Sequence, residues 1–431
     1  MKSPRKDFFF LKYLGNTSWM LSERIFKTLS SFLIGVFVAK YLGPEKFGYL
    51  NYVIAFVAIF IPIAEMGYST ILLRELNPLN KHTRNQVVST AFYLNLLVSL
   101  IVLALIWGIV GFGVHDRELA SFISIYAIVV LFKPFSIIDY YYQSQIKAKK
   151  SSIIKTVTLV IVSGFKLILI LFKADLKFFI FAYLLDIILA SIFFILTYSF
   201  EGNSLFMKSP DLTIAMGLLK SSWPMVISSL SIILYMRMDQ LMIKNMMNAS
   251  ELGLYSVSVR VYEGMIMIST VASTSILPVL VMLNNDSEDR FEKRLTELFR
   301  ILFWGNIFLA LFITIFDNNI ILLLFGEQYE RASTTMSILM WTAGFASLGS
   351  LTSRYFTVKK MEKKLALRTF ISLLINLSLN YWLIPIYGIN GSAIATGVSL
   401  LIGNYLIDYF DKDLTKLIKV KNKALFKWIS R

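Results

Sequence analysis

The sequence contains no cysteine, only two histidines and few charged residues. Without cysteine the chain can form no disulfide, offers no thiolate nucleophile and holds no cysteine-ligated metal. The histidines, His82 and His115, both fall in loops between apolar runs, so they suggest no zinc or haem site. We therefore expect no cofactor and no bound metal.

Charged residues make up 16% of the 431 positions, whereas soluble domains carry roughly 25%. Hydrophobic residues make up 56%, and apolar runs of about 20 residues recur along the whole length. These runs leave no room for a soluble catalytic lobe. A P-loop of the form GxxxxGKS/T does not occur, nor does a supported HExxH or GxSxG element. The composition indicates an all-α polytopic membrane protein that is not an enzyme.

Charged residues, glycine and proline divide the apolar runs into about twelve transmembrane helices. A polar, turn-rich stretch separates the sixth from the seventh. We expect a six-helix lobe at 1–200, a cytoplasmic linker at 201–220, a second six-helix lobe at 221–410 and a basic cytoplasmic tail at 411–431. Because each lobe has an even number of spans, both lobes run in the same direction and form a parallel internal repeat.

Most lysines and arginines lie at the N-terminus, in the loops after even-numbered spans and in the tail. The positive-inside rule then places both termini in the cytoplasm. The net charge of +16 is explained by this bias and by lipid headgroups, so it does not indicate nucleic-acid binding. From residue 412 onward, apolar side chains alternate with lysines, which is typical of an amphipathic helix on the inner leaflet.

One segment near the N-terminus has an echo in the second lobe. Gly43-Pro44 separates two apolar runs, 14–40 and 47–72, and predicts a membrane hairpin. When Gly48 is aligned with Gly253, an offset of 205 positions, the neighbouring residues match in character. The two lobes are therefore expected to be related.

Basic residues inside the spans are the candidates for substrate binding, because a charge at membrane depth costs on the order of 2.5–3.5 kcal/mol. Four are proposed to face an anionic cargo: Arg24, Lys133, Arg237 and Arg260. Guanidinium and ammonium groups in a cavity would suit a diphosphate. Each has a structural alternative, such as an ion pair of Arg24 with Glu23 or of Arg260 with Glu263.

Acidic residues and one further arginine in the spans are candidates for ion coupling or gating: Asp239, Glu263, Asp139 and Arg354. A carboxylate in a span can accept and release a proton. The same side chains serve equally well as partners in structural ion pairs. For Asp139 and Arg354, which fall toward the cytoplasmic ends of their spans, interfacial or gating salt bridges are the default interpretation.

The chain resembles the Wzx-type polysaccharide biosynthesis flippases, which transport O-antigen repeat units and belong to the multidrug/oligosaccharidyl-lipid/polysaccharide exporter superfamily. The resemblance covers nearly the whole length, and its most specific motif is VAKYLGPEKFG at 38–48. The other matching motifs are EMG at 65–67, RE at 74–75, KPF at 133–135, DY at 139–140, Asp239, ELGLY at 251–255 and FGEQY at 325–329.

The resemblance implies a two-lobed transporter of the bacterial inner membrane that alternates between inward- and outward-open states. It would move an undecaprenyl-diphosphate-linked oligosaccharide from the cytoplasmic to the outer leaflet, using a cationic central cavity and a proton or sodium gradient. A polymerase and chain-length proteins of the same pathway would be partners. Three alternatives stay open: a drug or organic-cation antiporter of the same superfamily, a membrane polysaccharide polymerase, and a scaffold that transports nothing.

Overall fold

The computed structural model describes residues 4–77, 80–203, 205 and 209–427. Over these residues the chain is helical throughout and contains no strand. Nine of the described helical stretches are long and apolar enough to cross a membrane, from Ser22–Glu75 to Lys363–Phe410. The protein is therefore an all-α, multi-span membrane protein, as the composition predicts.

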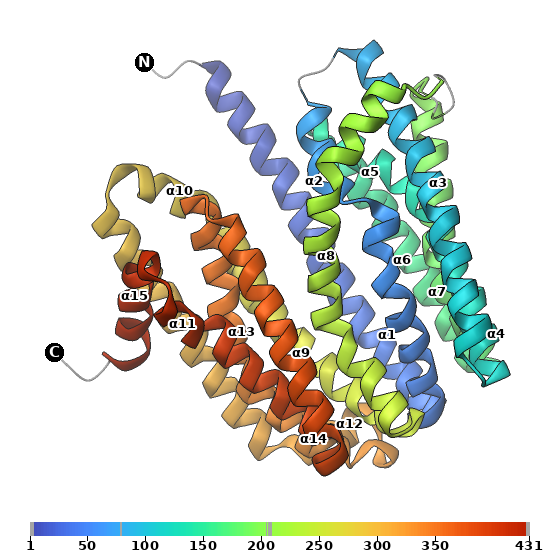
Figure 1. Ribbon diagram of the computed structural model, residues 1–431, viewed down its shortest axis with the longest axis vertical. Coiled ribbons are helices and arrows are strands. Elements are labelled where there is room, and N and C mark those ends of the chain that lie inside the picture. Colours follow the sequence, from blue (N-terminus) through green and yellow to red (C-terminus); the bar gives the residue numbers. More distant parts are fainter. Residues whose placement is uncertain (1–3, 78–79, 204, 206–208, 428–431) are drawn as a thin grey trace. The chain divides into compact units, whose positions relative to one another are not determined.

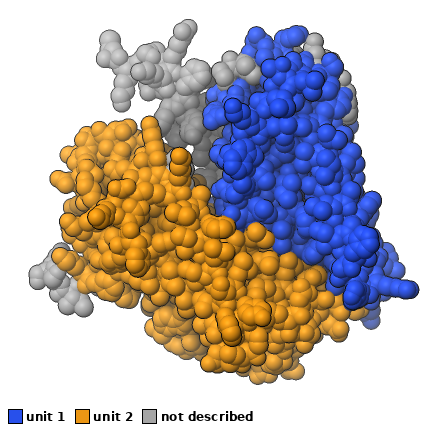
Figure 2. Space-filling view, in the orientation of Figure 1, with its two compact units in different colours: residues 1–38, 53–233 blue, residues 39–52, 234–431 orange. Residues whose placement is uncertain are grey.

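The chain forms two compact units that exchange a segment (Figure 2). The first unit contains residues 1–38 and 53–233, and the second contains residues 39–52 and 234–431. The boundary between the two units falls within one continuous helix, Leu212–Met246. The predicted division into lobes at 1–200 and 221–410 with a linker at 201–220 stays a prediction, and residues 204 and 206–208 of that linker lie outside the described residues. Each unit takes a piece of chain that a simple division into two lobes would give to the other.

The first unit is built around a core of aromatic and aliphatic residues that includes Tyr68, Phe92, Tyr142 and Tyr198. Side-chain caps fix two of its helix starts: Asn80 accepts a hydrogen bond from the backbone N–H of Thr83, and Asp116 does so for two residues of the next helix. Its elements, shown in Figure 1, are α1 (Pro4–Glu65), α2 (Tyr68–Glu75), α3 (Lys81–Gly113), α4 (Arg117–Ala127), η1 (Ile128–Phe135), α5 (Ser136–Ser144), α6 (Ala148–Leu171), α7 (Leu176–Phe200) and the first part of α8 (Leu212–Met246).

The second unit has its own core, in which Phe299 and Leu351 pack against Leu417 of the C-terminal helix. Its elements are α9 (Ala249–Ser275), α10 (Leu277–Asp286), α11 (Glu288–Ile315), α12 (Asp317–Phe325), η2 (Glu327–Tyr329), α13 (Ala332–Lys359), α14 (Glu362–Asn404), η3 (Leu406–Phe410), η4 (Lys412–Leu414) and α15 (Thr415–Phe426).

Two glycines interrupt the longest helices. Gly43 in α1 has φ 74° and ψ 169°, and Gly388 in α14 has φ 60° and ψ −140°. Both conformations are accessible essentially only to glycine. The blue ribbon of α1 reverses direction once in Figure 1, and Gly43 is the non-helical residue inside this helix, in agreement with the hairpin predicted from Gly43-Pro44. Gly388 divides α14 into a first arm, 362–387, and a second arm, 389–404.

The two glycines that align in the repeat meet in the second unit. A Cβ atom added to Gly48 would lie 1.7 Å from the carbonyl oxygen of Ala249, and one added to Gly253 would lie 1.9 Å from that of Pro44. The second arm of α1 and the start of α9 thus touch backbone to backbone, which only glycine permits. The side chain of Asn248 caps α9 at this contact by accepting from the N–H of Glu251.

The predicted tail helix is present as α15, although 428–431 lie outside the described residues. Leu417, Val420, Ala424 and Leu425 are buried on one side of it and join the core of the second unit. The apolar face expected to lie on lipid is therefore mostly packed on protein.

Candidate functional site

A pocket of about 150 Å³ in the first unit gathers charged side chains from five helical elements. Apolar residues of α7 form one wall. The charged residues that line it are Lys27 of α1, Lys133 of η1, Asp139 of α5, Lys155 of α6 and Asp186 of α7. Charges in an otherwise apolar helix bundle mark a functional site by default, because they are costly to keep there.

Lys133 enters this pocket from a stretch of 3₁₀-helix. Pro134 within η1 has no N–H to donate, and the helix is locally tightened over Ile128–Phe135. The ammonium of Lys133 donates to Oε1 of Glu65 at 2.9 Å, and its side chain is 15% exposed. One of the three ammonium donors is thus used by a carboxylate at the end of α1, while the group still lines the cavity.

Asp139 makes more polar contacts than the sequence suggests. It is buried, forms an ion pair with Lys155, and accepts hydrogen bonds from Ser151 and from Gln143, the latter at 2.9 Å. Lys155 and Ser151 were not predicted as site residues. Their spacing of four places both on one face at the start of an apolar helix, which is the signal that points to them.

Asp239 of α8 occupies a second, separate polar cluster inside the second unit. The Tyr255 hydroxyl of α9 donates to its Oδ2, and the backbone N–H of Gln240 donates to Oδ1 at 2.8 Å. Tyr255 in turn faces Ser392 and Thr396 on the second arm of α14. A buried carboxylate surrounded by hydroxyl groups presents oxygen atoms suited to a proton or a small hard cation.

The same arm of α14 extends the cluster. Ser399 contacts the Tyr235 hydroxyl at 3.4 Å and accepts from the amide of Asn376 at 3.4 Å, and Asn376 accepts from Asn380 at 3.0 Å. The Oδ1 atom of Asn380 is buried and has no hydrogen-bond partner among the described residues. The sequence analysis missed these residues. Two asparagines four positions apart in an apolar run are the signal that could have found them.

The remaining predicted residues are distributed over both units. Arg237 forms an ion pair with Glu263 at 3.8 Å, with side chains 28% and 48% exposed. Arg260 lies over the ring of Phe47, 5.5 Å from its centroid. Arg354 donates to the Thr274 hydroxyl at 3.3 Å.

Arg24 is exposed on α1, in the first unit, one turn before Lys27, which lines the charged pocket. The structure therefore brings Lys133 and Asp139 into one pocket of the first unit. It places Arg237, Arg260, Asp239, Glu263 and Arg354 in the second unit. The roles of all eight residues stay predictions.

The arrangement offers ion pairs and hydroxyl-lined carboxylates inside a helix bundle. Within the described part of the chain, no group of three or more histidine, cysteine or acidic side chains is placed so that it could hold a metal ion. These side chains can bind ions and polar groups at membrane depth, because a bound ion or polar group can contact them in place of a neighbouring side chain.

Comparisons with known proteins agree with this architecture. The profile of a family described as polysaccharide biosynthesis protein matches residues 13–284, and that of the MatE family matches residues 224–382. The chain is 21% identical over 418 residues to a protein of Shigella flexneri described as an O-antigen transporter, covering 93% of this chain and 97% of that one.

Two solved structures share the fold. The first is a lipid II flippase, MurJ, in an inward closed conformation, with a TM-score of 0.76 at 14% identity over 94% of this chain and 90% of that chain. The second is an inward-facing multidrug resistance MATE family transporter of the MOP superfamily, with a TM-score of 0.71 at 16% identity over 91% and 95% of the two chains.

Proposed function

Because the chain belongs to the polysaccharide biosynthesis protein family, a family of membrane transporters and flippases, we propose that it translocates an undecaprenyl-diphosphate-linked oligosaccharide from the cytoplasmic to the outer leaflet. The cargo would be an O-antigen or a related surface-polysaccharide repeat unit. The observation that carries the proposal is the charged pocket of the first unit, in which Lys27, Lys133 and Lys155 gather among membrane helices.

The physical problem is the headgroup. A diphosphate and several sugars would lose their water in hydrocarbon, and each uncompensated charge or hydroxyl would make the crossing prohibitive. The ammonium of Lys133 has three N–H donors, so it can contact a phosphate while it keeps its carboxylate partner Glu65, and neither charge is left bare in the membrane. The prenyl chain would remain in lipid throughout.

The proposed architecture is a twelve-span transporter with both termini in the cytoplasm and a parallel internal repeat. Twelve spans follow if the stretches broken at Gly43 and Gly388 each cross twice and α13 crosses once, in addition to the other stretches of suitable length. Alternating access between inward- and outward-open states would carry the headgroup across. The membrane would be the inner membrane of a bacterium, since one relative is the protein of Shigella flexneri described as an O-antigen transporter.

The Asp239 cluster is the proposed coupling site. Its carboxylate and the Tyr255 hydroxyl supply oxygen ligands in a buried setting, which suits a proton or a sodium ion. Asp239→Asn should abolish the dependence of transport on the ion gradient while Arg237→Gln leaves that dependence in place. Transport would be measured in energised cells with and without an ionophore for each ion. Equal ionophore sensitivity of Asp239→Asn and the wild type would rule out this role.

The function is tested by the sidedness of lipid-linked sugars. In cells that lack the gene, the proposal expects repeat units to accumulate facing the cytoplasm, where a sugar-modifying probe that cannot cross the membrane fails to reach them. Complementation should return them to the outer face. Normal sidedness with unpolymerised units outside would refute the flippase function and favour a polymerase.

A second candidate is an organic-cation antiporter, because the MatE profile matches residues 224–382 and carboxylates of Asp139 and Asp186 line the charged pocket of the first unit. An antiporter would export cationic dyes, driven by an ion that enters the cell down its own gradient. Wild-type lipid-linked sugars together with faster loss of dye from cells expressing the protein would favour this candidate over the flippase.

A further inference from the structure

An apolar groove of about 800 Å³ lies on the second unit, where the C-terminal helix α15 meets α11 and α14. Its size falls within the roughly 300–1,000 Å³ typical of small-molecule sites. Aromatic and aliphatic side chains line it, with the hydroxyl of Tyr405 as a polar exception. The lining includes Phe303, Trp304 and Phe308 of α11, Leu401 of α14 and Phe426 of α15.

The charge pattern of α11 places this groove just inside the hydrocarbon layer. From Glu288 to Arg300 the helix carries acidic and basic residues in every turn, whereas residues 301–316 contain none. The polar boundary of the membrane therefore lies near Arg300. Phe303 and Trp304 follow within about one turn, at 1.5 Å of rise per residue, so the groove opens next to the headgroup region and extends toward the membrane centre.

Basic residues of α11 and α15 lie within about one turn of residues that line the groove. The guanidinium of Arg300 donates to the backbone carbonyl of Lys423 at 3.3 Å, and its Nε–H is buried with no hydrogen-bond acceptor among the described residues. Lys419, Lys423 and Lys427 are exposed and spaced four apart, so they form one stripe along α15 and its C-cap. A negatively charged group at this position would meet a buried donor and a row of ammonium groups.

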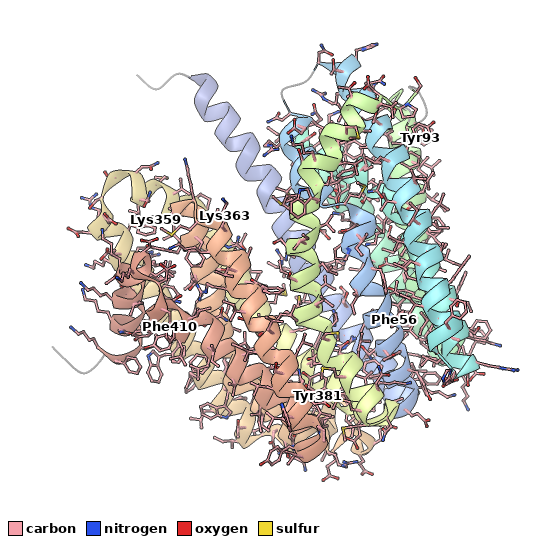
Figure 3. The ribbon with its side chains drawn as sticks, in the orientation of Figure 1. Phe56, Tyr93, Lys359, Lys363, Tyr381 and Phe410 are labelled. Atoms are coloured by element: carbon pink, nitrogen blue, oxygen red, sulfur yellow. The ribbon has the colours of Figure 1, made fainter. Side chains whose placement is uncertain are left out.

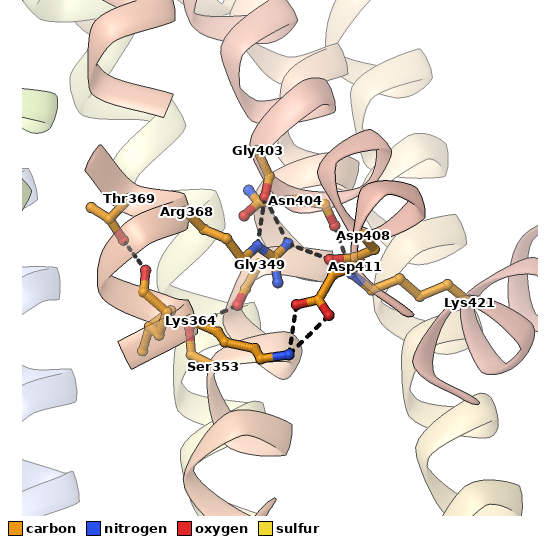
Figure 4. Close-up of polar contacts among 11 residues, drawn as sticks. Gly349, Ser353, Lys364, Arg368, Thr369, Gly403, Asn404, Asp408, Asp411 and Lys421 are labelled. Carbon is orange, nitrogen blue, oxygen red and sulfur yellow. Dashed lines mark hydrogen bonds and ion pairs between the residues drawn. The ribbon is translucent and has the colours of Figure 1, made fainter. Parts of the chain in front are cut away.

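The wall that α15 contributes is held in place by buried charges, as Figure 4 shows. The Lys421 ammonium donates to Asp408 at 2.6 Å and to the backbone carbonyl of Asn404 at 2.7 Å, and Arg368 approaches Asp408 at 3.3 Å. The Tyr405 hydroxyl at the groove donates to Asn422 of α15 at 2.7 Å. The groove is thus preformed, and not a chance gap beside a loose tail.

The exposed aromatic residues near the groove fit a lipid-facing surface. Phe410, labelled in Figure 3, is 90% exposed, Phe308 is 69% exposed and Phe426 is 66% exposed. Large apolar side chains with this exposure would be unfavourable in water but are favourable in contact with lipid chains.

From this combination we propose that the groove is a binding site for an anionic phospholipid of the leaflet in which α15 lies. One acyl chain fills the apolar groove, and the phosphate lies between the Arg300 guanidinium and the lysine stripe of α15. A zwitterionic lipid has the same chains, but its own positive charge weakens the attraction to this stripe. The site is distinct from the charged pocket of the first unit, and the proposal goes beyond flipping of the cargo.

The test is native mass spectrometry of the full-length protein in detergent, with dioleoylphosphatidylglycerol or dioleoylphosphatidylcholine added as the probe. We expect one phosphatidylglycerol to be retained preferentially. Arg300→Gln should weaken this retention about tenfold, which is the loss expected for one charge-assisted hydrogen bond. Arg290→Gln is the matched control, because Arg290 is a highly exposed arginine on the same helix whose guanidinium forms an ion pair with Asp286.

Two further variants separate lipid binding from a structural role of Arg300. Arg300→Lys keeps the charge and should retain most of the phosphatidylglycerol. Leu401→Phe fills the groove without touching any charge and should weaken retention of phosphatidylglycerol.

Four outcomes would overturn the proposal. These are equal retention of the two lipids, equal weakening by Arg290→Gln, retention unaffected by Leu401→Phe, or displacement of phosphatidylglycerol by a prenyl diphosphate, which would make the groove part of the cargo path.

Discussion

Lys133 forms an ion pair with Glu65 in the charged pocket of the first unit, so a single substitution cannot tell substrate binding from charge balance. We predict that Lys133→Met lowers transport by about tenfold or more, since an ammonium contact to phosphate is lost. The double variant Lys133→Met with Glu65→Gln removes both charges and should fold well, yet it should transport as poorly. The measurement is the fraction of lipid-linked oligosaccharide at the outer face, at matched protein levels.

Glu65→Gln alone is the control, because it leaves the lysine in place. It should retain much of the transport lost in Lys133→Met. Recovery of wild-type transport in the double variant would show instead that Lys133 serves only as the counter-ion of Glu65.

Lys421 provides a pH-dependent prediction outside the spans. Its burial lowers the pKa of the ammonium from 10.5 to about 7; Asp408 opposes this shift and Arg368 adds to it. Between about pH 7 and 10.5, undocked α15 therefore binds one proton more than docked α15, and docking becomes stronger as the pH rises. We predict that protection of α15 amides from hydrogen exchange increases about fiftyfold from pH 7 to 9, after correction for intrinsic rates.

The control compares two lysines of the same helix. Lys421→Met should lose this pH dependence, whereas Lys419→Met, at an exposed position, should keep it. An unchanged slope in Lys421→Met would assign the effect to another group.

At the scale of single residues, the sequence identified charges that are costly in a membrane but not their partners. Lys133 and Asp239 stand out because each is a charged residue within a long apolar run. The partner of Lys133, Glu65, is 68 positions away, and the tyrosine that donates to Asp239 lies on another helix. Such pairings depend on how helices cross, which one sequence does not record.

The helix crossing at Gly48 and Gly253 gives a prediction at the scale of elements. A methyl group at either position would lie within 2 Å of a carbonyl oxygen, so α1 and α9 would have to move apart. We predict that Gly48→Ala and Gly253→Ala each destabilise the protein by about 1–3 kcal/mol or more, as overpacking does. The measurement is the melting temperature of the purified protein in detergent.

Gly108→Ala and Gly111→Ala in α3 are matched controls. A Cβ atom at either position meets nothing within 4 Å, and alanine favours the helix by about 1 kcal/mol. These variants should be as stable as the wild type or more so. A melting temperature of Gly48→Ala equal to that of the controls would mean that the two helices can separate without cost.

Helix breaks were predictable only where backbone chemistry forces them. Gly43 precedes a proline and adopts a conformation that other residues avoid, so the Gly43-Pro44 pair alone predicted the hairpin. Pro224 and Pro385, by contrast, lie inside α8 and α14 without ending them. Proline interrupts a helix when the freed carbonyls find other partners, and that depends on neighbouring helices.

For the molecule as a whole, composition sufficed for the fold class, because only helices satisfy their backbone in lipid over runs of this length. The division into units did not follow from it. Residues 39–52 join the second unit through contacts such as the Tyr329 hydroxyl on the carbonyl of Ala39 and Gln328 on that of Lys40. These partners are nearly 300 positions apart in the sequence, and no local sequence pattern predicts their contact.

Topology is the prediction that concerns the entire chain, and the absence of cysteine makes it directly testable. The distribution of lysine and arginine places His115 outside and Lys293 in the cytoplasm. We predict that a membrane-impermeant maleimide labels His115→Cys in intact cells but labels Lys293→Cys only after permeabilisation. Both positions are exposed, so failure to react would reflect sidedness and not burial.

Lys416 of α15 pairs with Glu288 at 2.9 Å, near Lys293 at the start of α11, so Lys293→Cys reports on the C-terminal helix as well. Labelling of Lys293→Cys in intact cells would reverse the orientation, and the proposed direction of transport would have to be reversed with it.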